Sequence, residues 1–181
     1  MKKILLTAAL FAALNPAFAQ KFMTRTGKIT FFSGTSVENI EAINNDVASV
    51  IDGKSGDVMF QVPIKSFHFE KQLMQEHFNE NYMESDKFPK AEFRGKIDNA
   101  AALTKDGTYN VKASGKLTMH GVTRDVTTNG TVTVKGGVVT VNSKFKVKPA
   151  DYGIKIPSVV ASKIAEQIEV TVNTILNPVN K

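Results

Sequence analysis

The sequence predicts an all-β domain, an extended eight-stranded antiparallel barrel with one or two short connecting helices. Apolar and polar residues alternate with period two over long stretches, which is typical of antiparallel strands with one dry and one wet face. Glycine turns such as Gly136-Gly137 separate these stretches. Eight stretches can be counted, and at this number a sheet can close into a small barrel and remove its edges.

The individual strands follow from this alternation. Between residues 111 and 119, Val111, Leu117 and Met119 share one face, and lysine, serine and threonine residues occupy the other. Several stretches contain about 12 residues, or roughly 40 Å of strand, so the barrel is expected to be long and narrow and able to enclose an elongated cavity. The predicted strands span residues 22–33, 43–52, 57–65, 91–98, 108–119, 122–135, 138–148 and 166–177.

Two segments depart from the alternation and are predicted as short helices in the connections. Residues 70–83 have helical spacing, with Met74, Phe78 and Tyr82 on one face. Residues 158–166 show the same spacing more weakly. We expect both helices to lie near the mouth of the barrel.

The first 19 residues are predicted to be a secretory signal peptide. Lys2 and Lys3 precede a short apolar run, and Ala17-Phe18-Ala19 forms a small-x-small cleavage site. Cleavage after Ala19 would leave residues 20–181, which are 181 − 19 = 162 residues, as a single domain. The protein is therefore expected to be periplasmic or secreted.

The composition excludes several classes of protein. The chain has no cysteine, so it can have no disulfide, no thiol nucleophile and no zinc site with sulfur ligands. The charge of +6 falls to 21 − 17 = +4 when Lys2 and Lys3 leave with the signal peptide. Because the basic residues are spread along the strands, nucleic acid is not an expected partner. The composition leaves open a peripheral membrane contact and a homodimer.

The stretch from Glu76 to Phe93 is the strongest candidate for chemistry, because it combines a histidine with acidic and aromatic residues. His77 and Glu80 lie one helical turn apart, but di-metal sites of this kind need several carboxylate-bearing helices. His68 and His120 lie in other segments and lack ligand spacing. The stretch is interpreted as helix, stop and strand. The sequence also lacks known catalytic motifs, so we predict no metal, no cofactor and no enzymatic activity.

Three motifs resemble those of the YceI-like, lipocalin-like family. They are His77-Phe78 followed by Phe88-Pro89-x-Ala91-x-Phe93, then GKLTMHGVTRDV at residues 115–126, and then Asp151-Tyr152-Gly153-Ile154. The resemblance spans residues 27–176, and its middle motif is the most specific. It implies an exported bacterial protein with an extended eight-stranded antiparallel barrel, in which some members bind a polyisoprenoid or a related long amphiphile.

The sequence departs from this family pattern at two places. Many members open with a strand of the Trp-x-x-Asp-x-x-His-Ser type, whereas residues 22–27 occupy that region here and the chain has no tryptophan. The arginine that follows the helix histidine in the family is also missing, and Asn79 stands near that place.

Two functional hypotheses follow, and the first is a carrier or sequestering protein for a long apolar molecule such as a polyisoprenoid, an isoprenoid quinone or a related lipid. A dry interior hides apolar surface from water at about 25 cal/mol per Å², so a long tail would be stabilised inside. The residues predicted to line the cavity and bind this ligand lie on the dry faces and are Ile29, Phe31, Val58, Phe60, Val62, Phe93, Leu117, Met119, Phe145, Ile168 and Val170.

The second hypothesis is a structural or protein-interaction module of the cell envelope, with a packed barrel and no ligand. Period-two alternation is compatible with both hypotheses. Small residues on the dry faces favour a cavity, because a filled barrel would place bulkier side chains there. These small residues are Ala113, Gly115, Gly130 and Ser143.

Overall fold

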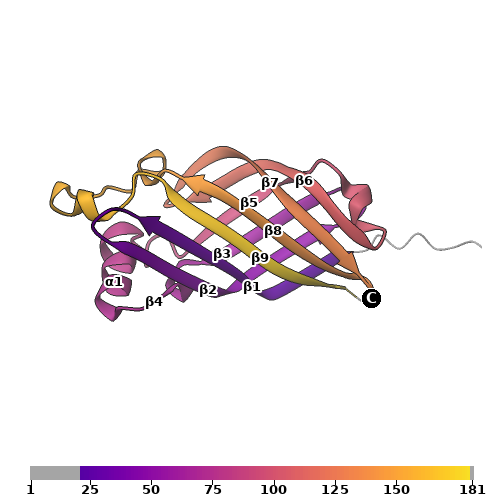
Figure 1. Cartoon of the computed structure of the whole chain (residues 1–181), viewed down its shortest axis with the longest axis horizontal. Coiled ribbons are helices and arrows are strands. Elements are labelled where there is room, and N and C mark those ends of the chain that lie inside the picture. Colours follow the sequence, from indigo (N-terminus) through magenta and orange to yellow (C-terminus); the bar gives the residue numbers. More distant parts are fainter. Residues whose placement is uncertain (1–20, 180–181) are drawn as a thin grey trace, which may run out of the picture.

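The structure is a computed structural model that describes residues 21–179. The predicted signal peptide, residues 1–19, lies outside the described residues. Eight long strands wind into a closed antiparallel barrel (Figure 1). They are β1 (Lys21–Gly34), β2 (Asn39–Asp52), β3 (Asp57–Pro63), β5 (Lys90–Ile97), β6 (Gly107–Met119), β7 (Val122–Lys135), β8 (Val138–Val147) and β9 (Ile168–Pro178).

The barrel closes through the pairing of β1 with β2. Neighbouring strands run in the order β1, β9, β8, β7, β6, β5, β3 and β2, and β2 then pairs back with β1. A further strand, β4 (His68–Phe69), pairs with β2 beyond the end of β3. The predicted fold class is confirmed, and β4 was missed because its two residues are too few to show alternation.

The pairing of β1 with β2 shifts its register twice, between Thr24 and Gly27 and between Gly27 and Ile29. A β-bulge changes which residues face inward. In β2 the buried residues are accordingly even-numbered up to Asn44 and odd-numbered from Val47 onward. This change of parity interrupts the simple alternation that strand prediction relies on.

Most predicted strand boundaries lie within two residues of the observed ones. The prediction for residues 43–52 is the exception, because β2 begins four residues earlier, at Asn39. The change of parity inside β2 conceals its first part from a search for unbroken alternation. The strand predicted at 57–65 ends at Pro63, where a 3₁₀ turn, η1 (Ile64–Ser66), takes over.

The helix predicted at residues 70–83 is shorter and is of two kinds. The α-helix α1 spans Gln72–His77 and continues as a π-helical turn, η2, over Phe78–Tyr82. The amide of Met83 donates to the carbonyl of Phe78, five residues back, at 2.8 Å, which is the bond that defines a π turn. In the described part of the chain, no helix has the length and apolar character needed to cross a membrane.

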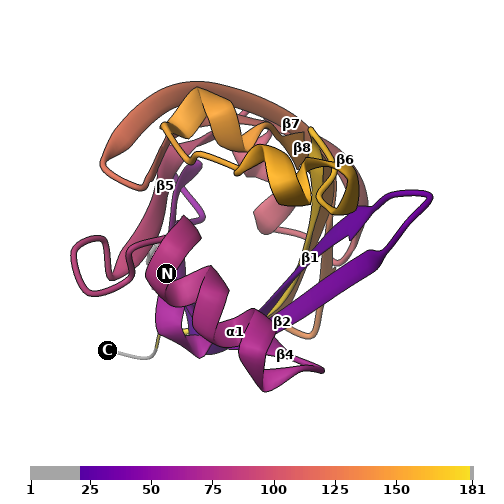
Figure 2. The same cartoon turned by 90° about the vertical axis from the view of Figure 1, so that its left-hand side faces the viewer.

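The helix predicted at residues 158–166 is a 3₁₀ helix, η5 (Ser158–Lys163). It follows another, η4 (Pro149–Tyr152), in the connection between β8 and β9. Figure 2 looks along the barrel from this end and shows α1 across from that connection. We call this end the mouth. The opposite end carries η3 (Ala100–Leu103), which joins β5 to β6, and we call it the closed end.

The closed end is filled by side chains. Leu103 from η3 is only 2% exposed and packs among inward-facing residues of the surrounding strands. A second buried cluster lies nearer the mouth and includes Ile29, Ile64, Met83 and Tyr152. The cluster at the closed end comprises Phe22, Ile51, Val58, Ile97, Leu103, Val111, Val132, Val134, Val139 and Leu176.

Candidate functional site

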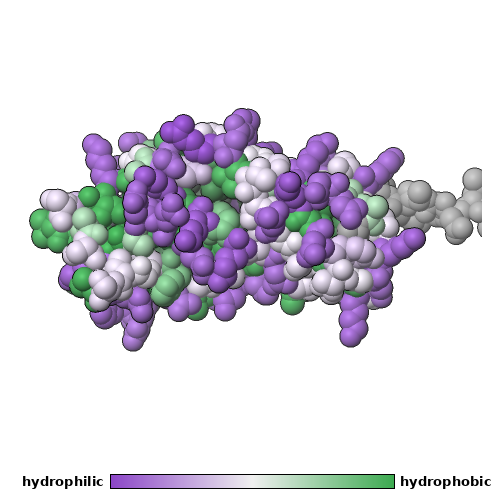
Figure 3. All heavy atoms as spheres, turned by 45° about the horizontal axis from the view of Figure 1, so that its top comes forward, coloured by the Kyte–Doolittle hydropathy of each residue, from purple (hydrophilic) through white to green (hydrophobic). Residues whose placement is uncertain are grey.

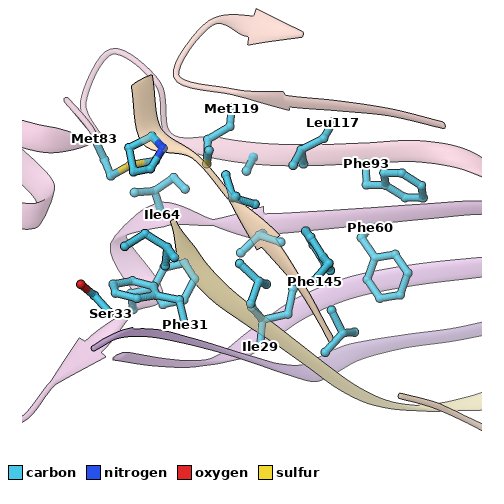
Figure 4. A pocket seen from close by; sticks show the side chains of 18 of the residues that line it. Ile29, Phe31, Ser33, Phe60, Ile64, Met83, Phe93, Leu117, Met119 and Phe145 are labelled. Carbon is cyan, nitrogen blue, oxygen red and sulfur yellow. The ribbon is translucent and has the colours of Figure 1, made fainter. Parts of the chain in front are cut away.

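The lumen of the barrel contains a cavity of about 580 Å³. Each of the eight long strands contributes side chains to its wall. The volume falls within the range of about 300–1,000 Å³ that is common for small-molecule sites. Figure 4 shows Ile29, Phe60 and Phe145 reaching the same space from three different strands. The barrel is therefore filled at the closed end and hollow toward the mouth.

All eleven residues predicted to line a cavity do line this one. The agreement follows from strand geometry, because alternate side chains point to the same face. Their contact with a ligand stays a prediction. Ile29 and Phe31 come from β1, Val58, Phe60 and Val62 from β3, Phe93 from β5, Leu117 and Met119 from β6, Phe145 from β8, and Ile168 and Val170 from β9.

A cluster of four phenylalanines lies near the mouth, and only Phe31 among them was predicted as part of the wall. Phe31, Phe67, Phe69 and Phe78 pack together, with ring centroids 5.0–5.6 Å apart, a spacing typical of aromatic pairs. All four rings line the cavity. Three of them come from the short elements between β3 and β5, where long-strand alternation gives no guidance. The one sequence signal for these residues is that Phe67 and Phe69 lie two positions apart, as residues on one face of a strand do.

The polar side chains of the wall gather mainly near the mouth. Lys71 and Glu38 form an ion pair of 3.4 Å there. The hydroxyl of Ser33 accepts a hydrogen bond from the amide of Ala165, at 2.8 Å. The wall residues of this polar group are Ser33, Glu38, Lys71, His77, Tyr82 and Lys163. This arrangement suits an elongated amphiphile with its polar group at the mouth and its apolar chain inside.

Two hydroxyl groups on the wall between β7 and β8 already have partners. The oxygens of Thr128 and Ser143 are 3.0 Å apart. Ser143 also donates to the carbonyl of Asn129, at 2.8 Å. Because these groups satisfy one another and the backbone, this part of the wall offers a ligand mainly apolar contact.

Two ionisable groups near the cavity have pKa values shifted away from neutral pH. A hydrogen bond from Arg94 holds the pKa of the Glu92 carboxyl below its usual range. Burial raises the pKa of the Tyr152 hydroxyl. At neutral pH Glu92 is therefore ionised and Tyr152 protonated, whereas a general acid or base works best with a pKa near the working pH.

The stretch from Glu76 to Phe93 forms the predicted helix, stop and strand. It contains the last two residues of α1, all of η2, a turn and the start of β5. Both His77 and Glu80 are exposed, and only His77 lines the cavity, near the mouth. Among residues 21–179, no three or more histidine, cysteine, aspartate or glutamate side chains are grouped so that they could hold a metal ion.

His120 links three segments at the mouth. Its Nδ1–H donates to the carbonyl of Tyr152 at 3.2 Å, and its Nε2 lies 2.8 Å from a carboxylate oxygen of Glu84. The ring packs against Phe88, with centroids 4.6 Å apart. Both His120 and Glu84 have positive φ angles, 52° and 43°, which are uncommon outside glycine. The histidine of the most specific motif thus joins the β6–β7 turn, the end of η2 and η4.

One of the four small residues expected to make room for a cavity, Gly115, does not do so. Ala113, Gly130 and Ser143 line the cavity, but Gly115 does not. A Cβ atom at Gly115 would collide with the carbonyl group of Arg94 and with the backbone of Gly95, its partner in β5. Gly115 therefore allows β5 and β6 to approach closely and adds no space to the lumen.

Comparison with known proteins gives matches to this architecture. A family model described as YceI-like domain matches residues 13–176. No curated protein matches the chain by sequence. A solved polyisoprenoid binding domain from Saccharophagus degradans, implicated in plant cell wall breakdown, is 18% identical, with 87% of this chain and 97% of that chain covered and a TM-score of 0.76.

Two further solved structures are similar. BcnA of Burkholderia cenocepacia is 16% identical, with 82% of this chain and 95% of that chain covered and a TM-score of 0.71. The YCEI protein of Campylobacter jejuni is 17% identical, with 82% of this chain and 90% of that chain covered and a TM-score of 0.63. At these identities the likeness shows a shared fold.

Proposed function

The chain belongs to the family of YceI-like domains, and from this premise we propose that it is an exported protein that carries or sequesters one long-chain apolar molecule inside its barrel. The ligand class is a polyisoprenoid, an isoprenoid quinone or a related lipid. The observation that carries the proposal is the cavity of about 580 Å³ with its apolar wall and polar mouth. The polyisoprenoid binding domain of Saccharophagus degradans has the same fold, which supports this ligand class.

The apolar wall supplies the driving force for binding. Each 100 Å² of apolar ligand surface removed from water contributes about 2.5 kcal/mol. Part of this gain is offset by the lost freedom of the ligand and of ordered side chains. A flexible chain that runs the length of the cavity would retain a net gain, and a short apolar molecule would retain much less. The proposed role therefore favours long ligands over short ones.

The distribution of polar groups supports one orientation of the ligand. The deeper wall is formed by apolar residues such as Phe60, Val111 and Val132. Lys71, Tyr82 and Lys163 line the cavity near the mouth. Burying a polar group without a hydrogen-bond partner is costly. This distribution supports an orientation with the apolar chain toward the closed end and the polar group at the mouth.

The alternative of a packed barrel with a purely external function requires a filled lumen. Side chains fill the closed end, but the cavity of about 580 Å³ remains toward the mouth. The cavity therefore favours the carrier proposal over this alternative, which requires a packed interior.

Extraction of the purified protein tests the proposal. The protein is exported from a bacterial host, purified without detergent and extracted with organic solvent, and the extract is analysed by mass spectrometry. We expect about one long-chain lipid per protein molecule. Protein that yields no lipid and also fails to bind an added isoprenoid quinone would contradict the proposal.

Export is the second part of the proposal and depends on the first 19 residues. We expect cleavage after Ala19, so that exported protein begins at Gln20. N-terminal sequencing of material from the periplasm and from the medium measures this directly. Exported material that retains Met1 would contradict the cleavage, and protein found only in the cytoplasm would contradict export.

A further inference from the structure

The mouth carries most of the exposed large apolar side chains of the described residues. Six such side chains are exposed between residues 21 and 179, and four of them belong to elements at the mouth. The other two lie on β9 and just after it, toward the closed end. Figure 3 shows hydrophobic surface gathered at the left-hand end of the molecule, which is the mouth. The four residues at the mouth are Phe32, Val37, Leu73 and Val159.

One segment extends beyond the strands at this end. The connection of residues 153–164, which we call the mouth segment, forms the outermost left-hand part of the molecule in Figure 1. Val159 in this segment is 88% exposed. Val160, Ile156 and Ile164 line the cavity. One side of the segment thus forms part of the cavity wall, and the other side exposes Val159 to solvent.

The charges of the mouth segment are all positive. It contains Lys155 and Lys163 and no acidic residue. Neither lysine forms an ion pair with any residue in the described range. Other lysines near the mouth are neutralised, for example Lys65 by Asp86. Unpaired lysines beside an exposed apolar residue are typical of segments that bind the interface of an anionic membrane.

We propose that the mouth segment docks on an anionic lipid bilayer, with Val159 inserted between head groups and Lys155 and Lys163 against lipid phosphates. Docking in this orientation brings the mouth of the cavity to the membrane surface. The inference rests on the proposed function, because a membrane lipid could then enter the cavity without crossing bulk water. The four exposed apolar residues at the mouth lie on separate elements around the opening, namely β1, the β1–β2 turn, α1 and η5. A bilayer surface could contact all four of these elements at once.

Vesicle flotation tests the docking. Exported protein is mixed with vesicles of phosphatidylglycerol and phosphatidylethanolamine, or with vesicles of phosphatidylcholine alone. We expect the wild type to float with the anionic vesicles and much less with phosphatidylcholine. The double variant Val159→Asp/Lys155→Glu should partition at least about tenfold less onto the anionic vesicles, because it replaces the inserted side chain with a carboxylate and also reverses one charge. Neither substituted residue lines the cavity.

A matched double variant controls for the change in charge and for the loss of an exposed apolar residue. Ile175→Asp/Lys54→Glu alters the net charge by the same amount. Ile175 is 54% exposed on β9, and Lys54 lies in the turn between β2 and β3 at the closed end. We expect this variant to float like the wild type. Equal flotation of the wild type and the mouth variant, or no flotation of the wild type, would overturn the docking proposal.

A second readout separates docking from ligand binding. An isoprenoid quinone is delivered from cyclodextrin without vesicles, and uptake is measured for the wild type and both double variants. Equal uptake by all three, together with impaired flotation of the mouth variant alone, supports docking as a separate step. Failure of all three to take up quinone would contradict the proposed function instead. If the mouth substitutions abolish a dimer in sedimentation and leave flotation intact, the mouth is a contact between copies and the membrane proposal is wrong.

Discussion

Phe60 stands where the filled and hollow parts of the barrel meet. It lines the cavity and packs against both buried clusters. Its partner in β5 is Phe93, another wall residue. A substitution at this position can therefore affect both the filled part of the lumen and the cavity.

Replacing Phe60 with lysine should abolish uptake of a long apolar ligand. The ammonium group would either be desolvated in an apolar lumen, at a cost of several kcal/mol, or draw water into it. Binding of a fluorescent isoprenoid analogue measures the effect, and circular dichroism must first show an intact β spectrum. Undiminished uptake by the folded variant would contradict the role of the lumen.

Thr131→Lys is the matched control for this substitution. Thr131 lies in the middle of β7 and does not line the cavity. The same lysine placed there should leave uptake within about twofold of the wild type, since outward-facing substitutions usually change stability by less than about 0.5 kcal/mol. Equal loss of uptake in both variants would point to general damage to the barrel.

Gly115→Ala should destabilise the fold without directly altering the cavity. The new Cβ would overlap backbone atoms of Arg94 and Gly95, which cannot move without separating β5 from β6. Overpacking of this kind costs about 1–3 kcal/mol, and calorimetry should show a lower melting temperature. Gly34→Ala is the control, because the nearest atoms there belong to the partly exposed ring of Phe32, which can turn aside. Equal melting temperatures for the two variants would contradict the close approach of β5 and β6.

At the scale of elements, the mouth is held by contacts between segments that are far apart in the sequence. His120 in the β6–β7 turn reaches Glu84 after η2 and Tyr152 in η4. Arg124 in β7 donates from Nε to the carbonyl of Asp151 at 2.9 Å. These contacts position the short elements around the opening, while the long strands hold the rest of the barrel.

His120→Ala should loosen these segments and lower stability by about 1–3 kcal/mol, because the carbonyl of the buried Tyr152 loses its hydrogen bond. The side chain of His120 is only 11% exposed. Thermal unfolding measures the loss, and amide exchange should increase near residues 84 and 152 while the closed end stays protected. His68→Ala is the matched control, because His68 is exposed on β4. A melting temperature equal to that of the wild type would contradict the role of His120.

At the scale of the whole molecule, the barrel divides along its length. The closed end has a buried core that includes Leu103 from η3, so this end is packed by the protein's own side chains. The part toward the mouth encloses the cavity and is covered by short helical segments (Figures 1 and 2). A ligand would therefore add stability to a barrel that is already folded.

Loading the barrel should raise its melting temperature. A ligand that binds only the folded state at 100 times its Kd stabilises by about 2.7 kcal/mol. For a domain of this size, each kcal/mol corresponds to about 2–4 °C. Calorimetry of lipid-depleted protein, with and without an isoprenoid quinone, measures the shift. Phe60→Lys should show no shift, and a wild type that is equally insensitive would contradict ligand binding.

The alternation of residues by itself determined which side chains face the lumen. All eleven predicted wall residues line the cavity, because the direction of a side chain is a local property of a β-strand. The strand ranges were also close to those observed, except in β2, where the register shifts change the parity of its buried residues. Such a shift arises from pairing with β1, so alternation within one strand cannot reveal it.

Only the tertiary structure decided how much of the lumen is empty. That depends on the closure of β1 on β2 and on Leu103, which enters the closed end from a connection. The phenylalanine cluster at the mouth and the contact of His120 with Glu84 likewise join segments from separate parts of the chain. Side-chain direction follows from the backbone of each strand, whereas empty volume and long-range contacts depend on how all the strands and connections pack together.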